Sequence, residues 1–200
     1  MPSVQTLVAD IVAGNVVGIG AKPPSDDSNS RSAISGTCRI EHNFVHTKIT
    51  FTAGNRVSFN SAKNDLTFHG SYVHFNSDMS IAGNMDHNRP IAVSGNFSGC
   101  MWKVYRIQGG ASYKCIHIPR EGGVGADAFV DLCENYARQS NWTEIRSVGT
   151  NNAAMGGPLN HGEEILFVSQ LFANVRIDTV RIKVNGQGLI TQTDSWSDIL

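Results

Sequence analysis

The sequence contains few charged residues and no cluster of basic ones. Lysine, arginine, aspartate and glutamate make up 16% of the 200 residues, against about 25% in an average soluble domain. The formal net charge is −1, and lysine and arginine are scattered along the chain. A nucleic-acid-binding domain usually carries a basic patch or stripe. We therefore expect no nucleic-acid partner.

Long apolar runs are also absent. Residues 1–21 are largely apolar, but they contain Asp10 and Asn15 and no lysine or arginine. A secretory signal peptide begins with a positively charged region, and a membrane-spanning helix needs about 20 apolar residues. The sequence predicts neither a signal peptide nor a membrane span.

Cysteine is scarce, and its spacing fits no metal site. The four cysteines are Cys38, Cys100, Cys115 and Cys133, with no C-x-x-C pair. Zinc sites favour such close pairs, and a disulfide framework is typical of smaller secreted chains. His42 and His46 would share one face of a strand about 13 Å apart, too far to hold one ion. We expect reduced thiols and no metal, although one isolated disulfide is compatible with the sequence.

The composition favours a single β-rich domain spanning residues 1–200. Glycine accounts for 20 residues, and short alternating segments are separated by turn residues, as in a sandwich or meander. The predicted fold class is α+β: two mixed or mainly antiparallel β-sheets packed as a sandwich, with two or three flanking helices. The predicted strands are 38–44, 48–52, 56–60, 65–69, 72–76, 91–93, 101–107, 112–118, 142–148, 164–173 and 176–184.

Two segments have helical periodicity. Val4, Leu7, Val8, Ile11 and Val12 recur at helical spacing, with Ser3 as a possible cap and Gly14 as a stop. Residues 127–140 place Phe129, Leu132, Cys133 and Tyr136 on one stripe, which predicts that Cys133 is a core residue.

Four further segments complete this prediction. The almost continuous apolar stretch 165–168 favours a central strand buried on both faces. The tail from residue 187 onward is polar, so we expect a loosely packed cap. Two loops, 23–36 and 149–162, are long and polar, and loops of this kind are often functional. The second could shape a substrate opening, and the first is more simply a connector.

The candidate site lies in residues 94–117, which read SGNFSGCMWKVYRIQGGASYKCIH. Cys100 follows the flexible Gly99 and precedes one predicted strand, and His117 ends the next. If the two strands form a simple hairpin across the turn at 108–111, Cys100 and His117 lie at the same end. A thiol and an imidazole at hydrogen-bond distance form a nucleophile and its base.

Both residues also have a simpler interpretation. A cysteine at the start of a strand is usually a small core residue, and a histidine between Ile116 and Ile118 is usually structural. His161, in the loop 149–162, is an alternative base that we rank below His117.

The Ser-Gly-Cys turn, the hydroxyl residue six positions earlier and the histidine one strand-turn-strand later resemble the glutamine deamidases of the cytotoxic necrotizing factor type. That group includes the Burkholderia-type lethal factor and, more distantly, the bacterial chemotaxis-receptor deamidases. The resemblance implies that Cys100 is the nucleophile, His117 the base and Ser94 the third member, where some relatives have threonine. Phe97 stands where leucine is usual.

The resemblance implies a function as well as a site. It predicts a thiol-dependent protein-glutamine deamidase that needs no cofactor, carries a sandwich fold and acts as a monomer. It also implies a secreted or injected bacterial effector that acts on a host protein in the host cytoplasm. The alternatives are a transglutaminase or cysteine protease with the same Cys-His pair, and a non-enzymatic β-sandwich binding module.

Overall fold

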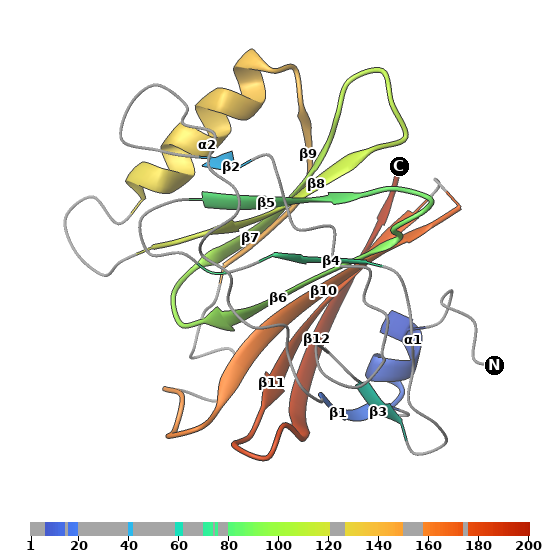
Figure 1. The fold of residues 1–200 in the computed structure, drawn as a ribbon, viewed down its shortest axis with the longest axis vertical. Coiled ribbons are helices and arrows are strands. Elements are labelled where there is room, and N and C mark those ends of the chain that lie inside the picture. Colours follow the sequence, from blue (N-terminus) through green and yellow to red (C-terminus); the bar gives the residue numbers. More distant parts are fainter. Residues whose placement is uncertain are drawn as a thin grey trace.

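The computed structural model shows two β-sheets packed face to face with helices outside them (Figure 1). It describes residues 7–14, 16–19, 40–41, 59–61, 70–73, 75, 80–120, 127–149, 158–173 and 176–200. The predicted α+β sandwich is confirmed.

The first sheet, called here the β10 sheet, has the strand order β12-β11-β10-β6-β4. Strand β4 runs parallel to β6, and the other neighbours are antiparallel. The bounds are β4 (Gly70–Val73), β6 (Ile91–Phe97), β10 (Glu164–Phe172), β11 (Arg176–Val184) and β12 (Ile190–Ile199).

The second sheet, called here the β7 sheet, has the order β2-β5-β8-β7-β9. Only the two-residue strand β2 is parallel to its neighbour. The bounds are β2 (Ile40–Glu41), β5 (Ser80–Met85), β7 (Met101–Arg106), β8 (Tyr113–Ile118) and β9 (Thr143–Gly149). A separate antiparallel pair joins β1 (Val16–Ile19) to β3 (Phe59–Ser61).

Strand β10 is the centre of its sheet and is buried on both faces, as its apolar run predicts. Ile165 and Phe167 belong to the core between the two sheets, whereas Leu166 and Val168 belong to a second core under the N-terminal helix. All four side chains are fully buried. Because successive residues of a strand point to opposite faces, a continuous apolar run is needed when both faces are covered.

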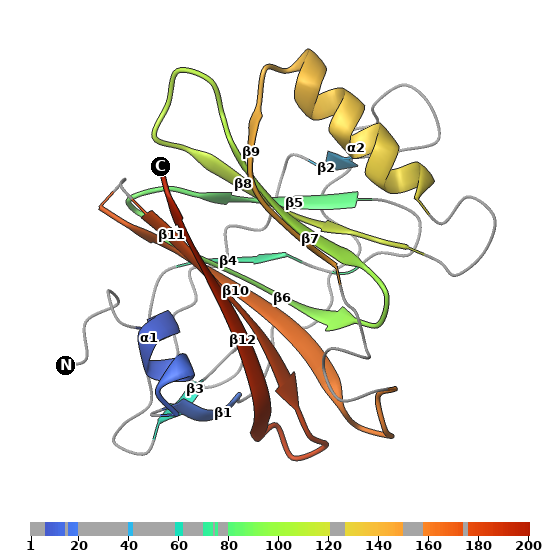
Figure 2. The ribbon, with the colours of Figure 1, turned by 180° about the vertical axis from the view of Figure 1, so that it is seen from behind.

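The N-terminal helix α1 (Leu7–Val12) covers the outer face of the β10 sheet (Figure 2). It buries Leu7, Val8 and Ile11, and the backbone N–H of Val8 donates to Oε1 of Gln170 at 3.0 Å. Val12, predicted to lie on the apolar face, is instead 48% exposed. The predicted cap Ser3 and Val4 lie outside the described residues.

The predicted helix 127–140 is present as α2 (Ala128–Gln139). It covers the outer face of the β7 sheet (Figure 1). Cys133 is fully buried, so its prediction as a core residue is confirmed. The buried ammonium of Lys103 on β7 pairs with Glu134 on α2 and, at 2.8 Å, with Glu144 on β9. This cluster fixes the helix to the sheet.

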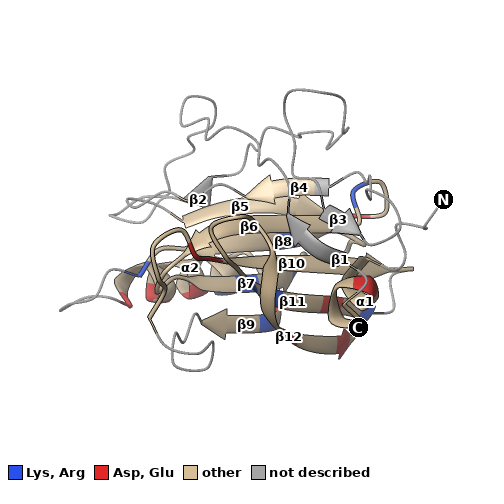
Figure 3. Cartoon of the chain, turned by 90° about the horizontal axis from the view of Figure 1, so that it is seen from below, with Lys and Arg blue, Asp and Glu red and all other residues tan. Residues whose placement is uncertain are grey.

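The predicted loosely packed tail is wrong. Residues from Ile190 form the ten-residue strand β12, which pairs with β11 along its whole length. An edge strand with solvent on one face carries polar residues at alternate positions, so its sequence resembles that of a loop. One ion pair of this strand joins the two sheets, because Arg146 on β9 binds Asp198 on β12. A second pair, between Arg181 on β11 and Asp194 on β12, lies within the β10 sheet. Residues of both charge signs occur on these strands (Figure 3).

Several predicted segments lie outside the described residues. They include the loop 23–36, the strands 48–52 and 65–69, and residues 150–157 of the loop 149–162. His42 and His46 lie there as well. No helix in the described part of the chain is long and apolar enough to cross a membrane.

Candidate functional site

The predicted hairpin of Cys100 and His117 is present. Strands β7 and β8 pair antiparallel, with Met101 opposite Ile118 and Trp102 opposite His117. Cys100 therefore precedes β7 at the end of the hairpin where His117 lies. Two residues apart on one extended strand share a face, so Cys100 follows the inward direction of Trp102 and belongs to the core between the sheets.

His117 is joined to Ser94 across the interior of the sandwich. The Ser94 hydroxyl oxygen lies 2.8 Å from Nδ1 of His117 and 2.6 Å from the backbone carbonyl of Val73 on β4. Ser94 comes from β6 in the β10 sheet, whereas His117 comes from β8 in the β7 sheet. The structure thus brings together two of the three predicted site residues from opposite sheets.

These two hydrogen bonds determine which ring nitrogen carries the proton. A serine hydroxyl has one proton to donate, and a backbone carbonyl can only accept. Ser94 therefore donates to Val73 and must accept from His117, which places the imidazole proton on Nδ1. In the neutral ring, Nε2 then keeps its lone pair.

Nε2 is buried and has no hydrogen-bond partner among the described residues. The His117 side chain is 1% exposed. Burial disfavours the charged imidazolium and lowers the pKa of His117 from 6.5 to about 3. At neutral pH the site therefore holds an uncharged ring with an open acceptor, which is what a general base must have before it takes a proton.

Two aromatic rings hold the imidazole in place. The Phe97 ring stacks on His117 with ring centres 3.8 Å apart and planes 6° apart, and Phe75 lies tilted at 5.2 Å. Phe97 is therefore more than a substitute for the leucine of the resembled motif. It covers one face of the His117 ring.

A bulge in β6 allows Ser94 and Phe97 to reach the same ring. In the pairing of β6 with β10, Ser94 lies opposite Phe167 and Phe97 opposite Ile165, which leaves one extra residue in β6. Asn96 has a φ of 62°, a left-handed conformation. Without the extra residue, positions 94 and 97 would point to opposite faces.

The bulge is held by Glu164, the first residue of β10. Its carboxylate Oε1 accepts the backbone N–H of Asn96 at 2.7 Å. A Cβ atom at Gly95 would collide with this same oxygen, so a larger residue there would displace the Glu164 carboxylate. The role of Glu164 was not predicted from the sequence, and the local signal for it was Gly95-Asn96 directly after the predicted strand 91–93.

Cys100 sits in the turn that sequence reasoning predicted, but it is not joined to the base. Gly99 has a φ of 153°, and a Cβ there would lie 3.4 Å from the Arg120 carbonyl. Cys100 is 3% exposed. Because Nε2 of His117 lacks a partner among the described residues, no hydrogen bond runs from the Cys100 thiol to it.

The environment of Cys100 favours the protonated thiol. Burial raises the pKa of the Cys100 thiol, and backbone hydrogen bonds at Arg120, Ser98 and Cys100 itself lower it by a smaller amount. Cys115 and Cys133 are fully buried core thiols, and burial raises the pKa of Cys115 as well. Of these three, only Cys100 lies in a turn, and Ser98 of the same turn lines a pocket to which Cys100 itself does not contribute.

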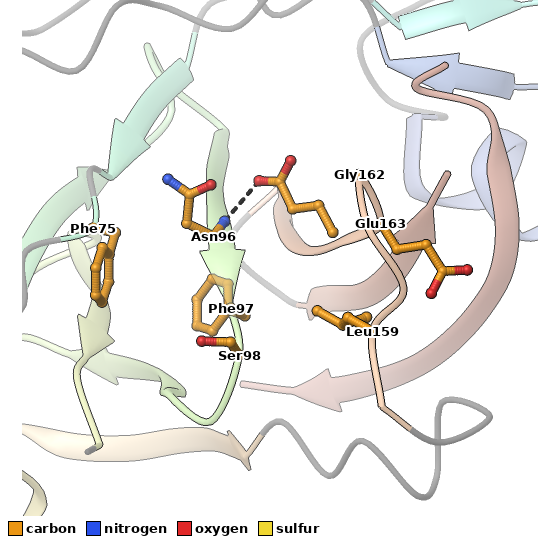
Figure 4. Close-up of a pocket in the computed structure, with 8 residues that line it drawn as sticks. Phe75, Asn96, Phe97, Ser98, Leu159, Gly162 and Glu163 are labelled. Atoms are coloured by element: carbon orange, nitrogen blue, oxygen red, sulfur yellow. Dashed lines mark hydrogen bonds between the residues drawn. The ribbon is translucent and has the colours of Figure 1, made fainter. Parts of the chain in front are cut away.

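That pocket has a volume of about 530 Å³ and lies between the end of β6 and the turn before β10 (Figure 4). Ser98, two residues before Cys100, forms part of it. Leu159 and Gly162 also line it, so the end of the polar loop 149–162 does border the candidate site. The lining residues are Phe75, Asn96, Phe97, Ser98, Leu159, Gly162, Glu163 and Glu164.

The remaining candidates contribute less. His161 is exposed in the turn next to Gly162 and is not among the lining residues. Within the described ranges, no group of three or more His, Cys, Asp or Glu side chains is arranged to hold a metal ion. The site as described consists of Ser94, Cys100 and His117 beside one pocket.

The chain matches no protein-family model, no curated protein and no solved structure. The roles of Cys100, His117 and Ser94 therefore stay predictions that depend on the short motif and on the geometry above.

Proposed function

We propose that the protein is a protein-glutamine deamidase in which Cys100 is the nucleophile, His117 the general base and Ser94 the residue that orients the base. The single observation that carries this proposal is the hydrogen-bonded chain from the Val73 carbonyl through Ser94 to Nδ1 of His117. It leaves a buried, proton-free Nε2 at the end of the hairpin that carries Cys100.

The reaction uses these groups in two steps. Sγ of Cys100 attacks the carboxamide carbon of a glutamine side chain while Nε2 takes the thiol proton. The imidazolium gives that proton to the departing nitrogen, and ammonia leaves a thioester. Nε2 then takes a proton from water, whose oxygen attacks the thioester carbon, and the thiol leaves reprotonated. The products are glutamate and ammonia.

In this scheme, Ser94 stabilises the imidazolium form of His117. When Nε2 takes a proton, the Nδ1–H continues to donate to the Ser94 oxygen, so the ring keeps its orientation. Since no hydrogen bond joins Sγ to Nε2 in the described structure, the turn at residues 98–100 must shift when substrate enters. The adjoining pocket gives the substrate a route to that turn.

The resemblance extends the proposal to the biological setting. It favours a secreted or injected bacterial effector that acts as a monomer on a host protein in the host cytoplasm. Conversion of one neutral glutamine to an anionic glutamate would be enough to disable a switch in such a target. A transglutaminase would share the thioester and differ only in using an amine in place of water, and a cysteine protease would cleave the backbone.

One observation favours a different class of function, a non-enzymatic β-sandwich binding module. Cys100 and His117 are almost fully buried, and burial raises the thiol pKa and lowers the imidazole pKa, so both groups are neutral. A pair of core residues would have the same properties. The two functions differ in whether Cys100 reacts.

The decisive experiment is mass spectrometry of host-cell lysate after treatment with wild-type protein or with Cys100→Ser. A glutamine that becomes glutamate only with wild-type protein establishes the deamidase and identifies its target. Cys115→Ser is the matched control, because Cys115 is a buried thiol of the same hairpin, and it should keep the activity of a folded wild-type protein. An amine adduct at the glutamine would instead identify a transglutaminase.

Alkylation kinetics separate the enzyme from the binding module. The enzyme predicts that Cys100 reacts with iodoacetamide faster than Cys115 and Cys133, and that the rate falls in His117→Ala. Equal, slow labelling of all three thiols together with an unchanged lysate would refute the deamidase.

A further inference from the structure

The proposed reaction creates two opposite charges, and Ser94 stabilises only the positive one. When Sγ of Cys100 attacks the carboxamide carbon, the thiol proton moves to His117 and an electron pair moves to the substrate oxygen. The resulting imidazolium donates to Ser94. Enzymes stabilise a negative oxygen of this kind with fixed hydrogen-bond donors. Donors for that oxygen must lie next to the sulfur of Cys100.

Backbone N–H groups surround this sulfur. Burial raises the pKa of the Cys100 thiol, and backbone hydrogen bonds at Arg120, Ser98 and Cys100 itself oppose that effect. A hydrogen bond lowers the pKa of a thiol when it stabilises the thiolate, and the only donor of the backbone is the N–H. The sulfur therefore lies among N–H groups from both ends of the hairpin, two from the turn before β7 and one from the segment after β8.

The register of the hairpin explains why the N–H after β8 belongs to Arg120. Met101, the first residue of β7, lies opposite Ile118, the last residue of β8. The residue after this pair is Pro119, which has no N–H. Arg120 therefore carries the first N–H beyond β8, at the end of the hairpin where Cys100 lies.

Arg120 differs from the other two donors because it lies outside the turn at residues 98–100. That turn must shift when substrate enters, whereas the guanidinium of Arg120 is paired with Asp127, the N-cap residue of α2. The Arg120 backbone also lies beside Gly99, where a Cβ atom would be 3.4 Å from the Arg120 carbonyl oxygen. A donor on this second segment can stay in place while the nucleophile moves.

We infer that the backbone N–H of Arg120, together with that of Cys100, forms the oxyanion hole for the reaction. The inference rests on the proposed deamidase function. In the attack, the Sγ–C bond forms, the π bond of the carboxamide breaks, and its electron pair goes to the oxygen. This oxygen is bonded to the carbon that Sγ has joined, so the Arg120 N–H can donate to it in place of the sulfur. The electron pair returns to carbon when ammonia leaves.

The main test replaces one N–H by an oxygen atom. Lysine, or its α-hydroxy acid analogue, is incorporated at position 120, so the two variants share a side chain and differ only in an amide or an ester. With acetyl-Gly-Gln-Gly amide as substrate, the ester should lower kcat by about 10²-fold relative to the Arg120→Lys amide, with little change in KM. The measurement is ammonia release, with circular dichroism to show that both variants are folded.

The Arg120→Lys amide is the matched control. It keeps the backbone N–H and loses the guanidinium, so its rate should fall at most about fivefold below that of wild type. Equal kcat values for the amide and the ester would overturn the inference.

A second measurement needs no variant. The same peptide with glutamate semialdehyde in place of glutamine adds to Cys100 as a hemithioacetal, in which the Sγ–C bond forms and the thiol proton ends on the aldehyde oxygen. That oxygen should accept from the proposed donors, so the amide proton NMR signals of Arg120 and Cys100 should move downfield. The amide signal of Cys133, on α2, should not move. An adduct that leaves the Arg120 signal in place would overturn the inference.

Turnover by wild-type protein separates this inference from the function it rests on. Downfield signals of Arg120 and Cys100 in the adduct, without ammonia release from the glutamine peptide, would support the oxyanion hole and refute the deamidase. Ammonia release with equal kcat from the amide and ester variants would support the deamidase and refute the role of Arg120. Formation of neither adduct nor ammonia would refute both.

Discussion

Two hydrogen-bonded links cross the interior of the sandwich. They differ in whether every polar atom of the aromatic ring has a hydrogen-bond partner. In the tryptophan link, the indole N–H of Trp102 donates to Ser169 at 2.9 Å, and Ser169 in turn bonds Thr179 at 2.8 Å. In the histidine link, His117 bonds Ser94, which bonds the Val73 carbonyl. Trp102 and His117 lie opposite each other in the hairpin, so the two links start from paired positions.

The two rings differ in the number of ring nitrogens that have no hydrogen-bond partner. Indole has one polar atom, and Trp102 uses it. Imidazole has two, and His117 uses one while Nε2 stays without a partner among the described residues. An unsatisfied buried polar atom costs about 1–3 kcal/mol, and such exceptions call for an explanation. We expect the tryptophan link to serve stability and the histidine link to serve chemistry.

The largest expected effect comes from removing the base. His117→Ala should lower the deamidation rate by about 10²–10⁴, the usual contribution of a general base. The measurement is the rate of ammonia release from a target peptide, with circular dichroism to show that the variant is folded. His117→Gln, which fills more of the site, should lose a similar amount. An equal loss in Trp102→Phe would mean that the links do not differ in function.

Of the two links, only the histidine link should make the stability of the fold depend on acid. The pKa of His117 is about 3 in the folded protein, against 6.5 for a solvent-exposed imidazole, so the unfolded chain binds its proton first as the pH falls. The His117 contribution to stability is complete above pH 6.5 and decreases toward pH 3, by at most about 1.4 kcal/mol per unit. Urea unfolding at several pH values should show this dependence in wild type and Trp102→Phe and a weaker one in His117→Gln. Identical profiles for wild type and His117→Gln would contradict it.

The tryptophan link should affect stability without affecting the reaction. Trp102→Phe removes the indole N–H and reduces the packed volume, which should lower the free energy of unfolding by about 2 kcal/mol. Denaturant unfolding measures this loss, and the deamidation rate of the folded variant should match that of wild type. Ser169→Ala should destabilise in the same direction. An unchanged unfolding midpoint in both variants would show that the hydrogen bond contributes nothing.

The smallest effect should come from Ser94, which acts only through His117. A hydrogen bond contributes about 1 kcal/mol, which corresponds to a rate loss of roughly fivefold in Ser94→Ala. Ser94→Thr keeps the hydroxyl and should keep most of the rate. Nitrogen-15 NMR of His117 should show the proton on Nδ1 in wild type and a mixed tautomer in Ser94→Ala. A larger rate loss in Ser94→Ala than in His117→Ala would reverse the two roles.

The elements that were predicted correctly are those in which local pattern and burial agree. The β7–β8 hairpin, the helix α2 with its core Cys133 and the doubly buried β10 each contain their own signal in consecutive residues. Strand β12 was missed because an edge strand has polar residues on its exposed face, and nothing local distinguishes it from a loop.

The residues of the candidate site could be singled out from the sequence, but the contacts among them could not. The motif singled out Ser94, Cys100 and His117, but the tautomer of His117 depends on the Val73 carbonyl, which β4 supplies from outside the motif. The bulge that directs Ser94 and Phe97 to one ring depends on Glu164, and no spacing within residues 94–117 could reveal that contact.

The dependence of the β6 bulge on Glu164 has a consequence for how the protein folds. Asn96 and Glu164 are 68 positions apart in the chain, and contacts of such long range form slowly because the intervening chain must first lose its freedom. During synthesis, Cys100 and His117 can pair as a hairpin well before β10 exists. The contact that fixes the bulge beside the His117 ring forms only after β10 joins β6, so an emerging chain already carries the Cys100 thiol but not yet the geometry that we propose for catalysis.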